Sequence, residues 1–106
     1  MEVGKIYNTE TYDGVVKPAL VLRAYGNHSV VVPMRKLYDS DLISMPEGDI
    51  TVQFEGNRDK YSVAMVGSIK SVPNKKIGRC LGTIYDIDLI AVTQELLKEV
   101  AYNEEG

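Results

Sequence analysis

Hydrophobic residues recur at strand spacing along most of the 106-residue chain and change to helical spacing near its C-terminus. Two segments rich in Val and Leu, Pro18–Ala24 and His28–Met34, are separated by three turn residues, which is typical of a β-hairpin. A second pair, Ile50–Phe54 and Tyr61–Val66, flanks the polar stretch Glu55–Asp59. This arrangement predicts another hairpin.

Shorter strands are expected at Val3–Tyr7 and at Ser68–Val72, where Pro73 ends the second one. Between the first strand and the first hairpin, Asn8–Gly14 is interpreted as a polar loop because it ends in an Asp-Gly turn signal. Arg35–Glu47 interrupts the strand pattern and predicts a loop with at most one helical turn.

The C-terminal pattern is the most regular in the chain. Its apolar residues are spaced three or four positions apart and include Leu89, Val92, Leu96 and Val100. Asp86 or Asp88 can cap the start of this helix, and residues 102–106 are expected to form a frayed acidic tail. Several short strands and one helix predict a mainly β fold, namely a small SH3-like barrel of five to seven strands with a C-terminal α-helix.

The composition, 44% hydrophobic and 25% charged, is that of a globular protein, and the length suits a single domain spanning residues 1–106. The formal net charge is −3, so the molecule has no overall positive field to attract nucleic acid. Any contact with a polyanion must therefore depend on a local cluster of cations.

Metal and membrane signals are missing from the sequence. A single histidine, His28, and a single cysteine, Cys80, occur without a CxxC or HExxH motif, so no metal site, cofactor or disulfide framework is expected. The first ten residues lack a signal-peptide pattern, and the apolar runs are shorter than a membrane span. A cytoplasmic protein that does not contact membranes is expected.

Two long segments resemble the two halves of MazF/PemK-type ribonuclease toxins. They are VVKPALVLRAYGNHSVVVPM and YSVAMVGSIKSVPNKKIGRCLGTIYDIDLIAVTQELLKEV. The resemblance implies a homodimeric, metal-independent endoribonuclease that cleaves single-stranded RNA and is neutralised by a cognate acidic antitoxin. It also implies the products, a 2′,3′-cyclic phosphate and a 5′-OH end.

The resemblance suggests two catalytic cations. Where the family strand begins with an Arg-Pro pair, this chain has Lys17 before Pro18, and lysine would act on the phosphate as a point charge. The family often has Thr or Ser after the next strand, whereas this chain has Arg35 and Lys36, which would form a phosphate clamp with Lys17. Alternatively, all three cations are ordinary solvated residues.

Further candidates contact the substrate. Tyr12, Tyr25 and Tyr38 lie in or beside predicted loops and can stack on bases. Asp13 and His28 are candidates for proton transfer, although a histidine in a hairpin turn is usually a surface residue.

Proton transfer is the weakest part of the resemblance. Many relatives carry an Asp-Gln pair where this chain reads Gly67-Ser68, so no carboxylate stands at that position of the sequence. A different basic run provides an alternative nucleic-acid track, unless it is a solvated turn: Lys70, Lys75, Lys76 and Arg79.

Two other functions are compatible with these departures from the family pattern. The chain could be a binding module that has kept the fold and lost catalysis. It could also be a CcdB-like poison that binds a topoisomerase subunit through its C-terminal helix.

Overall fold

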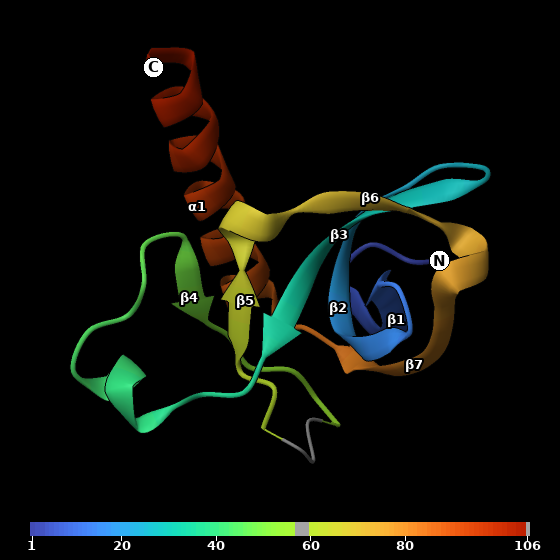
Figure 1. The fold of residues 1–106 in the computed structure, drawn as a ribbon, viewed down its shortest axis with the longest axis horizontal. Helices are drawn as coiled ribbons and strands as arrows, with labels where there is room; N and C mark the ends of the chain where they lie inside the picture. Colours follow the sequence, from blue (N-terminus) through green and yellow to red (C-terminus); the bar gives the residue numbers. More distant parts are fainter. Residues whose placement is uncertain (57–59, 106) are drawn as a thin grey trace.

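The computed structural model describes residues 1–56 and 60–105 of the chain (Figure 1). Residues 57–59, which belong to the predicted Glu55–Asp59 turn, lie outside the described part. Strands account for most of the regular structure: β1 (Lys5–Tyr12), β2 (Val15–Ala24), β3 (His28–Arg35), β4 (Asp49–Thr51), β5 (Val63–Met65), β6 (Lys70–Pro73) and β7 (Ile77–Thr83). The helical elements are the 3₁₀ turns η1 (Asp39–Leu42), η2 (Val66–Ser68) and η3 (Asn74–Lys76), and the helix α1 (Asp86–Glu105).

The strands form one antiparallel sheet in the order β4-β5-β3-β2-β1-β7, with β6 paired to β3. β3 changes partner along its length, because its first four residues pair with β6 and its last two pair with β5. Since β6 and β7 are joined by η3 alone and pair with β3 and β1, the sheet must curl to bring them together (Figure 1). The predicted mainly β class with a C-terminal helix is confirmed, although the backbone pairing of the described strands does not close into a ring.

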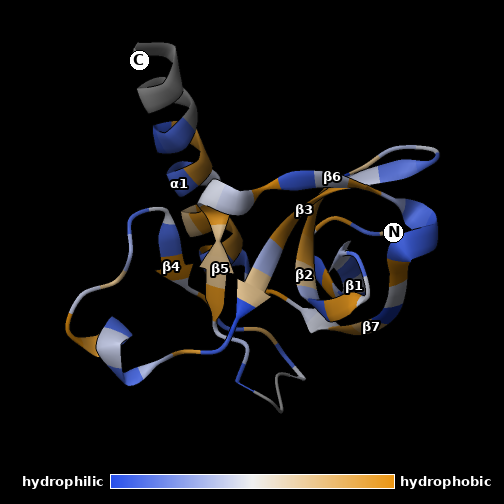
Figure 2. Cartoon of the chain, viewed as in Figure 1, coloured by the Kyte–Doolittle hydropathy of each residue, from blue (hydrophilic) through white to orange (hydrophobic). Residues whose placement is uncertain are grey.

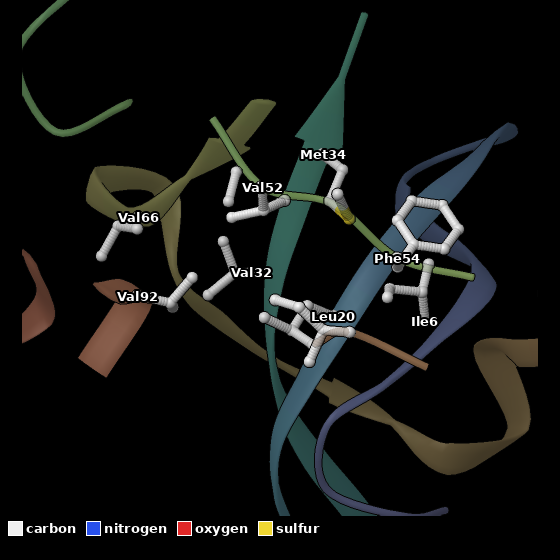
Figure 3. Packing of buried hydrophobic residues seen from close by; sticks show 10 residues of the cluster. Ile6, Leu20, Val32, Met34, Val52, Phe54, Val66 and Val92 are labelled. Atoms are coloured by element: carbon white, nitrogen blue, oxygen red, sulfur yellow. The ribbon is translucent and has the colours of Figure 1, made fainter. Parts of the chain in front are cut away.

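The central strands β1, β2 and β3 are buried on both faces. Side chains alternate between the two faces of a strand, and here each face supplies its own cluster. One cluster contains Ile6, Leu20, Val32, Met34, Val52, Phe54, Ala64, Val66, Ile84 and Val92 (Figure 3). The other contains Tyr7, Ala19, Val21, Val31, Val72 and Ile77. Burial on both faces explains why the β2–β3 hairpin is almost continuously apolar.

Both predicted hairpins are confirmed, since β2 pairs with β3 and β4 pairs with β5. The polar loop expected at Asn8–Gly14 was wrong, because β1 continues to Tyr12. Thr9 explains the continuation, since it is fully buried and its hydroxyl donates a hydrogen bond to the Tyr7 carbonyl. A polar residue whose donor is satisfied locally can occupy an inward strand position.

Strand β7 was not predicted from the sequence. Its side chains are mostly exposed, and its two glycines, Gly78 and Gly82, mask the alternation on which the prediction depended. Gly82 has a packing role, because a Cβ at this position would collide with the carbonyl oxygen of Glu55. The crossing of these two backbones therefore requires glycine.

Helix α1 packs against the first cluster through Val92, which is fully buried, with Leu89 and Leu96 partly buried beside it. Asp88 accepts a hydrogen bond from the backbone N–H of Gln53 at 3.0 Å, which ties the first turn of the helix to the segment after β4. α1 continues to Glu105, so helical conformation extends into the residues expected to fray; the fraying itself stays a prediction. No helix in the described ranges is sufficiently long and apolar to cross a membrane.

The contact at Gly82 gives the first testable prediction. Gly82→Ala should destabilise the protein by about 3 kcal/mol or more, because the new methyl group cannot be accommodated without moving backbone. Urea unfolding followed by circular dichroism measures the change. Gly26→Ala is the matched control, since a Cβ there meets nothing within 4 Å, and its effect should stay within about 1 kcal/mol. Equal stability of the two variants would contradict the close crossing.

Candidate functional site

Two lysines attach the tip of the β1–β2 hairpin to the other side of the curled sheet. Lys70 of β6 donates a hydrogen bond from Nζ to the Thr11 carbonyl at 3.1 Å, and its ammonium group lies 3.7 Å from the centre of the Tyr12 ring. Lys76 of η3 pairs with Glu10 at 3.0 Å and lies 3.8 Å from Asp13. These contacts bring part of the alternative basic run against Tyr12 and Asp13.

The two carboxylates beside Lys76, those of Glu10 and Asp13, differ in how firmly they are held. The Glu10 side chain is one-third exposed and hydrogen-bonded, and with its charge it raises the pKa of Lys76. The Asp13 side chain is fully solvent-exposed and only weakly engaged. Asp13 therefore remains free to reorient toward a ligand, whereas Glu10 helps to hold the tip.

Lys17 lies near the start of β2, paired in register with Thr9. It is exposed and makes no ion pair or hydrogen bond with any described residue. Alternation along β2 puts it on the same face as Ala19 and Val21, and alternation along β6 puts Lys70 on the same face as Val72. Lys17 and Lys70 therefore extend from the same face of the sheet, and Lys70 reaches the hairpin tip that precedes Lys17.

Arg35 lies at the end of β3, at the expected junction of strand and loop, but its guanidinium is already paired. Its Nη1 and Nη2 atoms donate to the two carboxylate oxygens of Asp41, both at 2.8 Å. Its Nη2 and Nε atoms also donate to Oδ2 of Asp49, at 3.0 and 3.3 Å. The side chains of Arg35, Asp41 and Asp49 are only 13%, 2% and 14% exposed. The guanidinium is therefore occupied by two carboxylates and is not free to bind a phosphate.

The electrostatics of this cluster follow from the bidentate contact. Hydrogen bonding to Arg35, followed by the hydrogen bond from the Tyr38 N–H at 2.7 Å, lowers the pKa of Asp41 to about 2. The same hydrogen bonding raises the already high pKa of Arg35. Because Asp41 belongs to η1, within the loop between β3 and β4, and Asp49 begins β4, Arg35 ties the end of β3 to the interior of this loop and to its far end.

Other predicted residues lie at the same end of the sheet as Lys17. Ala19 of β2 pairs with Pro33 of β3, and two residues farther along this antiparallel register Lys17 is opposite Arg35. The loop that follows β3 therefore begins beside Lys17. On that loop Lys36 lies 5.5 Å above the Tyr61 ring, and Tyr38, which is 57% exposed, packs 5.0 Å from the Arg35 guanidinium.

Tyr25 and His28 lie at the opposite end of the β2–β3 hairpin. Their rings stack with centroids 4.7 Å apart, and His28 Nδ1 lies 2.8 Å from the side-chain oxygen of Asn27. Along β2, Tyr25 is separated from Lys17 by about 26 Å at ~3.3 Å per residue. The structure therefore does not bring these two predicted residues to the Lys17 site.

The carboxylate of Glu99, which was not a predicted site residue, lies near Gly67-Ser68. Glu99 of α1 has one carboxylate oxygen 4.0 Å from where a Cβ on Gly67 would be, and the other 3.1 Å from the corresponding point on Gly48. No pattern in the sequence predicts this contact, because Glu99 is distant in the chain from both glycines. Among the described residues, no group of three or more His, Cys, Asp or Glu side chains could hold a metal ion.

Known proteins resemble this chain in structure only. No protein-family model matches the sequence, and no curated protein is significantly similar to it. A solved structure of an endoribonuclease in complex with its cognate antitoxin, from a mycobacterial species, matches with a TM-score of 0.77 and 11% identity over 95% of both chains. A second mycobacterial endoribonuclease matches with a TM-score of 0.71 and 12% identity over 92% of this chain and 88% of the other. The chain shares their fold.

The Arg35 cluster predicts a pH dependence of stability. Asp41 has a folded-state pKa of about 2, below its ordinary value of 3.8, so its ionised form stabilises the fold above about pH 4. This contribution is lost as the pH falls through 2. Asp41→Asn should lower the urea midpoint at pH 7, and its difference from the unmodified protein should shrink between pH 4 and pH 2.

The control is Asp39→Asn, which changes an exposed carboxylate of the same 3₁₀ turn that makes no ion pair with a described residue. Its urea midpoint should follow that of the unmodified protein at every pH. If the difference in urea midpoint between Asp41→Asn and the unmodified protein did not change with pH, the ion pair of Asp41 with Arg35 would not be the cause of that difference.

Proposed function

We propose that this chain is the toxin of a toxin–antitoxin pair, a cytoplasmic endoribonuclease that cleaves single-stranded RNA without a metal ion. The observation that supports the proposal most strongly is the shared fold. It extends over 95% of this chain and of an endoribonuclease bound to its cognate antitoxin. The resemblance of its two long segments to MazF/PemK-type toxins implies the same function, although no protein-family model matches the sequence.

The reaction begins on the substrate itself. The ribose 2′-OH attacks the adjacent phosphorus, the bond to the 5′-oxygen breaks, and the products are a 2′,3′-cyclic phosphate and a 5′-OH end. Because the substrate supplies its own nucleophile, the protein must position the backbone and stabilise the charge that develops on the phosphoryl oxygens. It must also accept the 2′ proton and return one to the leaving oxygen.

Lys17 is the proposed catalytic cation. Its exposed ammonium group has no partner among the described residues, so it can approach a phosphate without breaking an ion pair. Lys36 and the exposed rings of Tyr12 and Tyr38 would bind the flanking nucleotides, and Asp13 at the hairpin tip is the candidate for proton transfer. Arg35 is here a positioning residue, because its two ion pairs hold the loop that carries Lys36 and Tyr38.

The proposed partners follow from the same surface. A disordered acidic antitoxin segment would order on the Lys17 end of the sheet and compete with RNA for the cations there. The net charge of −3 does not oppose this binding, since at ~0.15 M salt charges farther away than roughly 8 Å are screened. Two copies of the chain are proposed to form the active homodimer.

A binding module without catalysis is the second candidate. One observation favours it: the guanidinium of Arg35, which the sequence suggested as a catalytic cation, is neutralised by Asp41 and Asp49. Incubating the purified protein with single-stranded RNA in EDTA separates the two functions. Fragments that carry 2′,3′-cyclic phosphate ends support the nuclease, whereas bound but intact RNA supports the module.

Substitution of Lys17 tests its catalytic role. Lys17→Ala should reduce the cleavage rate by about ten- to a thousandfold, the range for removing one positioned group that stabilises charge. Lys17→Arg should retain the rate or increase it, because arginine can contact two phosphate oxygens. Lys98→Ala, which removes a lysine 76% exposed on α1, serves as the control and should leave the rate unchanged. Full activity of Lys17→Ala would remove this residue from the mechanism.

Substitution of Tyr12 tests base stacking. Tyr12→Ala should weaken binding of a single-stranded oligoribonucleotide by about tenfold, within the range of roughly 1–3 kcal/mol per stacked base. Tyr12→Phe should bind normally, because it keeps the ring. Fluorescence anisotropy measures the affinity, with Tyr85→Ala as the control for an aromatic residue of similar exposure outside the proposed site. Unaltered affinity of Tyr12→Ala would place the bases elsewhere.

A further inference from the structure

A register shift in β1 turns Tyr12 toward the face of the sheet that carries Lys17. Thr9 pairs with Lys17, but Tyr12 pairs with Val15, so β1 has one extra residue between these two pairs. Because residues opposite each other on two strands share a face, Tyr12 lies on the face of Val15 and Lys17. Without the extra residue, alternation from Thr9 would point Tyr12 to the opposite face. A bulge of this kind re-aims a side chain.

Lys70 of β6 occupies one side of the Tyr12 ring. Its Nζ atom lies 3.7 Å from the ring centre and donates a hydrogen bond to the Thr11 carbonyl oxygen at 3.1 Å. A cation at this distance is attracted by the negative face of an aromatic ring. One ammonium group therefore holds both the backbone and the aromatic side chain of the hairpin tip.

Lys70 is itself anchored by the sheet. It pairs in register with Val31 of β3, which is fully buried, and Val72, two residues later in β6, is buried as well. Figure 2 shows hydrophilic (blue) residues at the start of β6, directly after a hydrophobic (orange) stretch. The ammonium group therefore extends from a strand whose backbone is fixed by its pairing with β3.

The other side of the Tyr12 ring is open. Tyr12 is 56% exposed although Lys70 lies against it, so the side away from Lys70 is accessible. The backbone position opposite Tyr12 lies two residues from Lys17 along β2, or about 7 Å at ~3.3 Å per residue. An exposed ring at this distance can stack on a base next to a phosphate that Lys17 contacts.

We infer that Lys70 is a positioning residue for nucleic-acid binding, because it holds the Tyr12 ring so that the open side of the ring stacks on a base of the bound strand. The inference rests on the single-stranded RNA ligand proposed above and adds the group that orients the stacking ring. A mobile side chain loses conformational freedom when it stacks, and this ordering costs affinity. Lys70 removes much of that cost before the strand binds.

The rest of the hairpin tip is held independently of Lys70. Lys76 of η3 pairs with Glu10 at 3.0 Å and lies 3.8 Å from Asp13, so its contacts lie on both sides of Tyr12 in the sequence. Gly14 has a φ of 73°, which suits glycine in the turn that follows. Removing the Lys70 ammonium group should therefore release the Tyr12 ring and leave the hairpin folded.

The first test measures binding of an uncleavable strand by fluorescence anisotropy. A single-stranded oligonucleotide of 2′-deoxyribose lacks the 2′-OH nucleophile, so its affinity does not depend on cleavage. Lys70→Met keeps the unbranched stem and removes the ammonium group. It should raise the dissociation constant about three- to tenfold, the range for one side chain that must be ordered on binding. Lys70→Arg should restore the affinity to within about twofold, because a guanidinium also donates hydrogen bonds and packs on aromatic rings.

The matched control is Lys75→Met. It removes the same charge from an exposed lysine of η3 that makes no ion pair or hydrogen bond with any described residue. Its dissociation constant should equal that of the unmodified protein. Equal losses in Lys75→Met and Lys70→Met would trace the effect to the general charge of the basic run and would overturn the inference.

A double-mutant cycle separates positioning from direct contact with the strand. In a Tyr12→Ala background, Lys70→Met should change the dissociation constant by less than about twofold, because the ring on which Lys70 acts is gone. An equal loss in both backgrounds would mean that the ammonium group binds the strand itself, and it would overturn the inference. Circular dichroism checks that the variants are folded.

The contact is also measurable without a ligand. Nζ of Lys70 lies over the Tyr12 ring, so the ring current should shift the NMR resonances of the adjacent methylene protons upfield. Tyr12→Ala should return these resonances to the position found for Lys75. Resonances that are identical in the unmodified protein and in Tyr12→Ala would overturn the contact, and the inference with it.

The outcomes also distinguish this inference from the proposed nuclease, because cleavage of single-stranded RNA in EDTA is measured on the same preparations. If the oligonucleotide binds with the expected losses and RNA stays intact, the inference holds and the nuclease is removed. If RNA is cleaved and Lys70→Met binds as tightly as the unmodified protein, the nuclease holds and the inference is overturned. An unmodified protein that does not bind the oligonucleotide overturns the inference as well.

Discussion

Burial of both faces of β1, β2 and β3 is the constraint on which the rest of the structure depends. The three strands place Leu20 and Val32 in one cluster and Val21 and Val31 in the other. A sheet with two apolar faces must be covered twice. β4, β5 and α1 cover one face, and the curl that brings β6 and β7 together covers the other. Both the curl and the C-terminal helix therefore follow from the hairpin at the centre.

The same constraint explains how much of the fold could be predicted. Both hairpins and the helix were predictable because apolar periodicity reports burial directly. Val32 and Val63 in the hairpins and Val92 in the helix are fully buried. Strand β7 was not predictable, because glycines interrupt its apolar pattern. Gly82 is required where the backbone of β7 passes the carbonyl of Glu55. The continuation of β1 through Thr9 was hidden for a related reason: the side chain is polar but satisfies its hydroxyl within its own strand.

The candidate site was predictable only where neighbours in the sequence are neighbours in space. Lys17, Tyr12 and Asp13 share a hairpin tip, so their proximity follows from the chain. The contacts of Lys70 and Lys76 with that tip depend on the curl of the sheet. No local pattern in the sequence predicts this curl. Arg35 was predicted from its position alone to bind phosphate, whereas in the structure its guanidinium pairs with Asp41 and Asp49, which only the folded loop brings to it.

The Arg35 cluster also has a consequence for the distribution of charge on the molecule. The guanidinium of Arg35 faces the carboxylates of Asp41 and Asp49, so this cluster carries one excess negative charge. Its side chains are largely buried, where screening by salt is weak. A polyanion that reaches the start of β2 would be repelled by this cluster and attracted to the exposed ammonium groups of Lys17 and Lys36. The fold thereby provides a one-sided electrostatic boundary, which would set the direction in which a flexible anionic chain leaves the site.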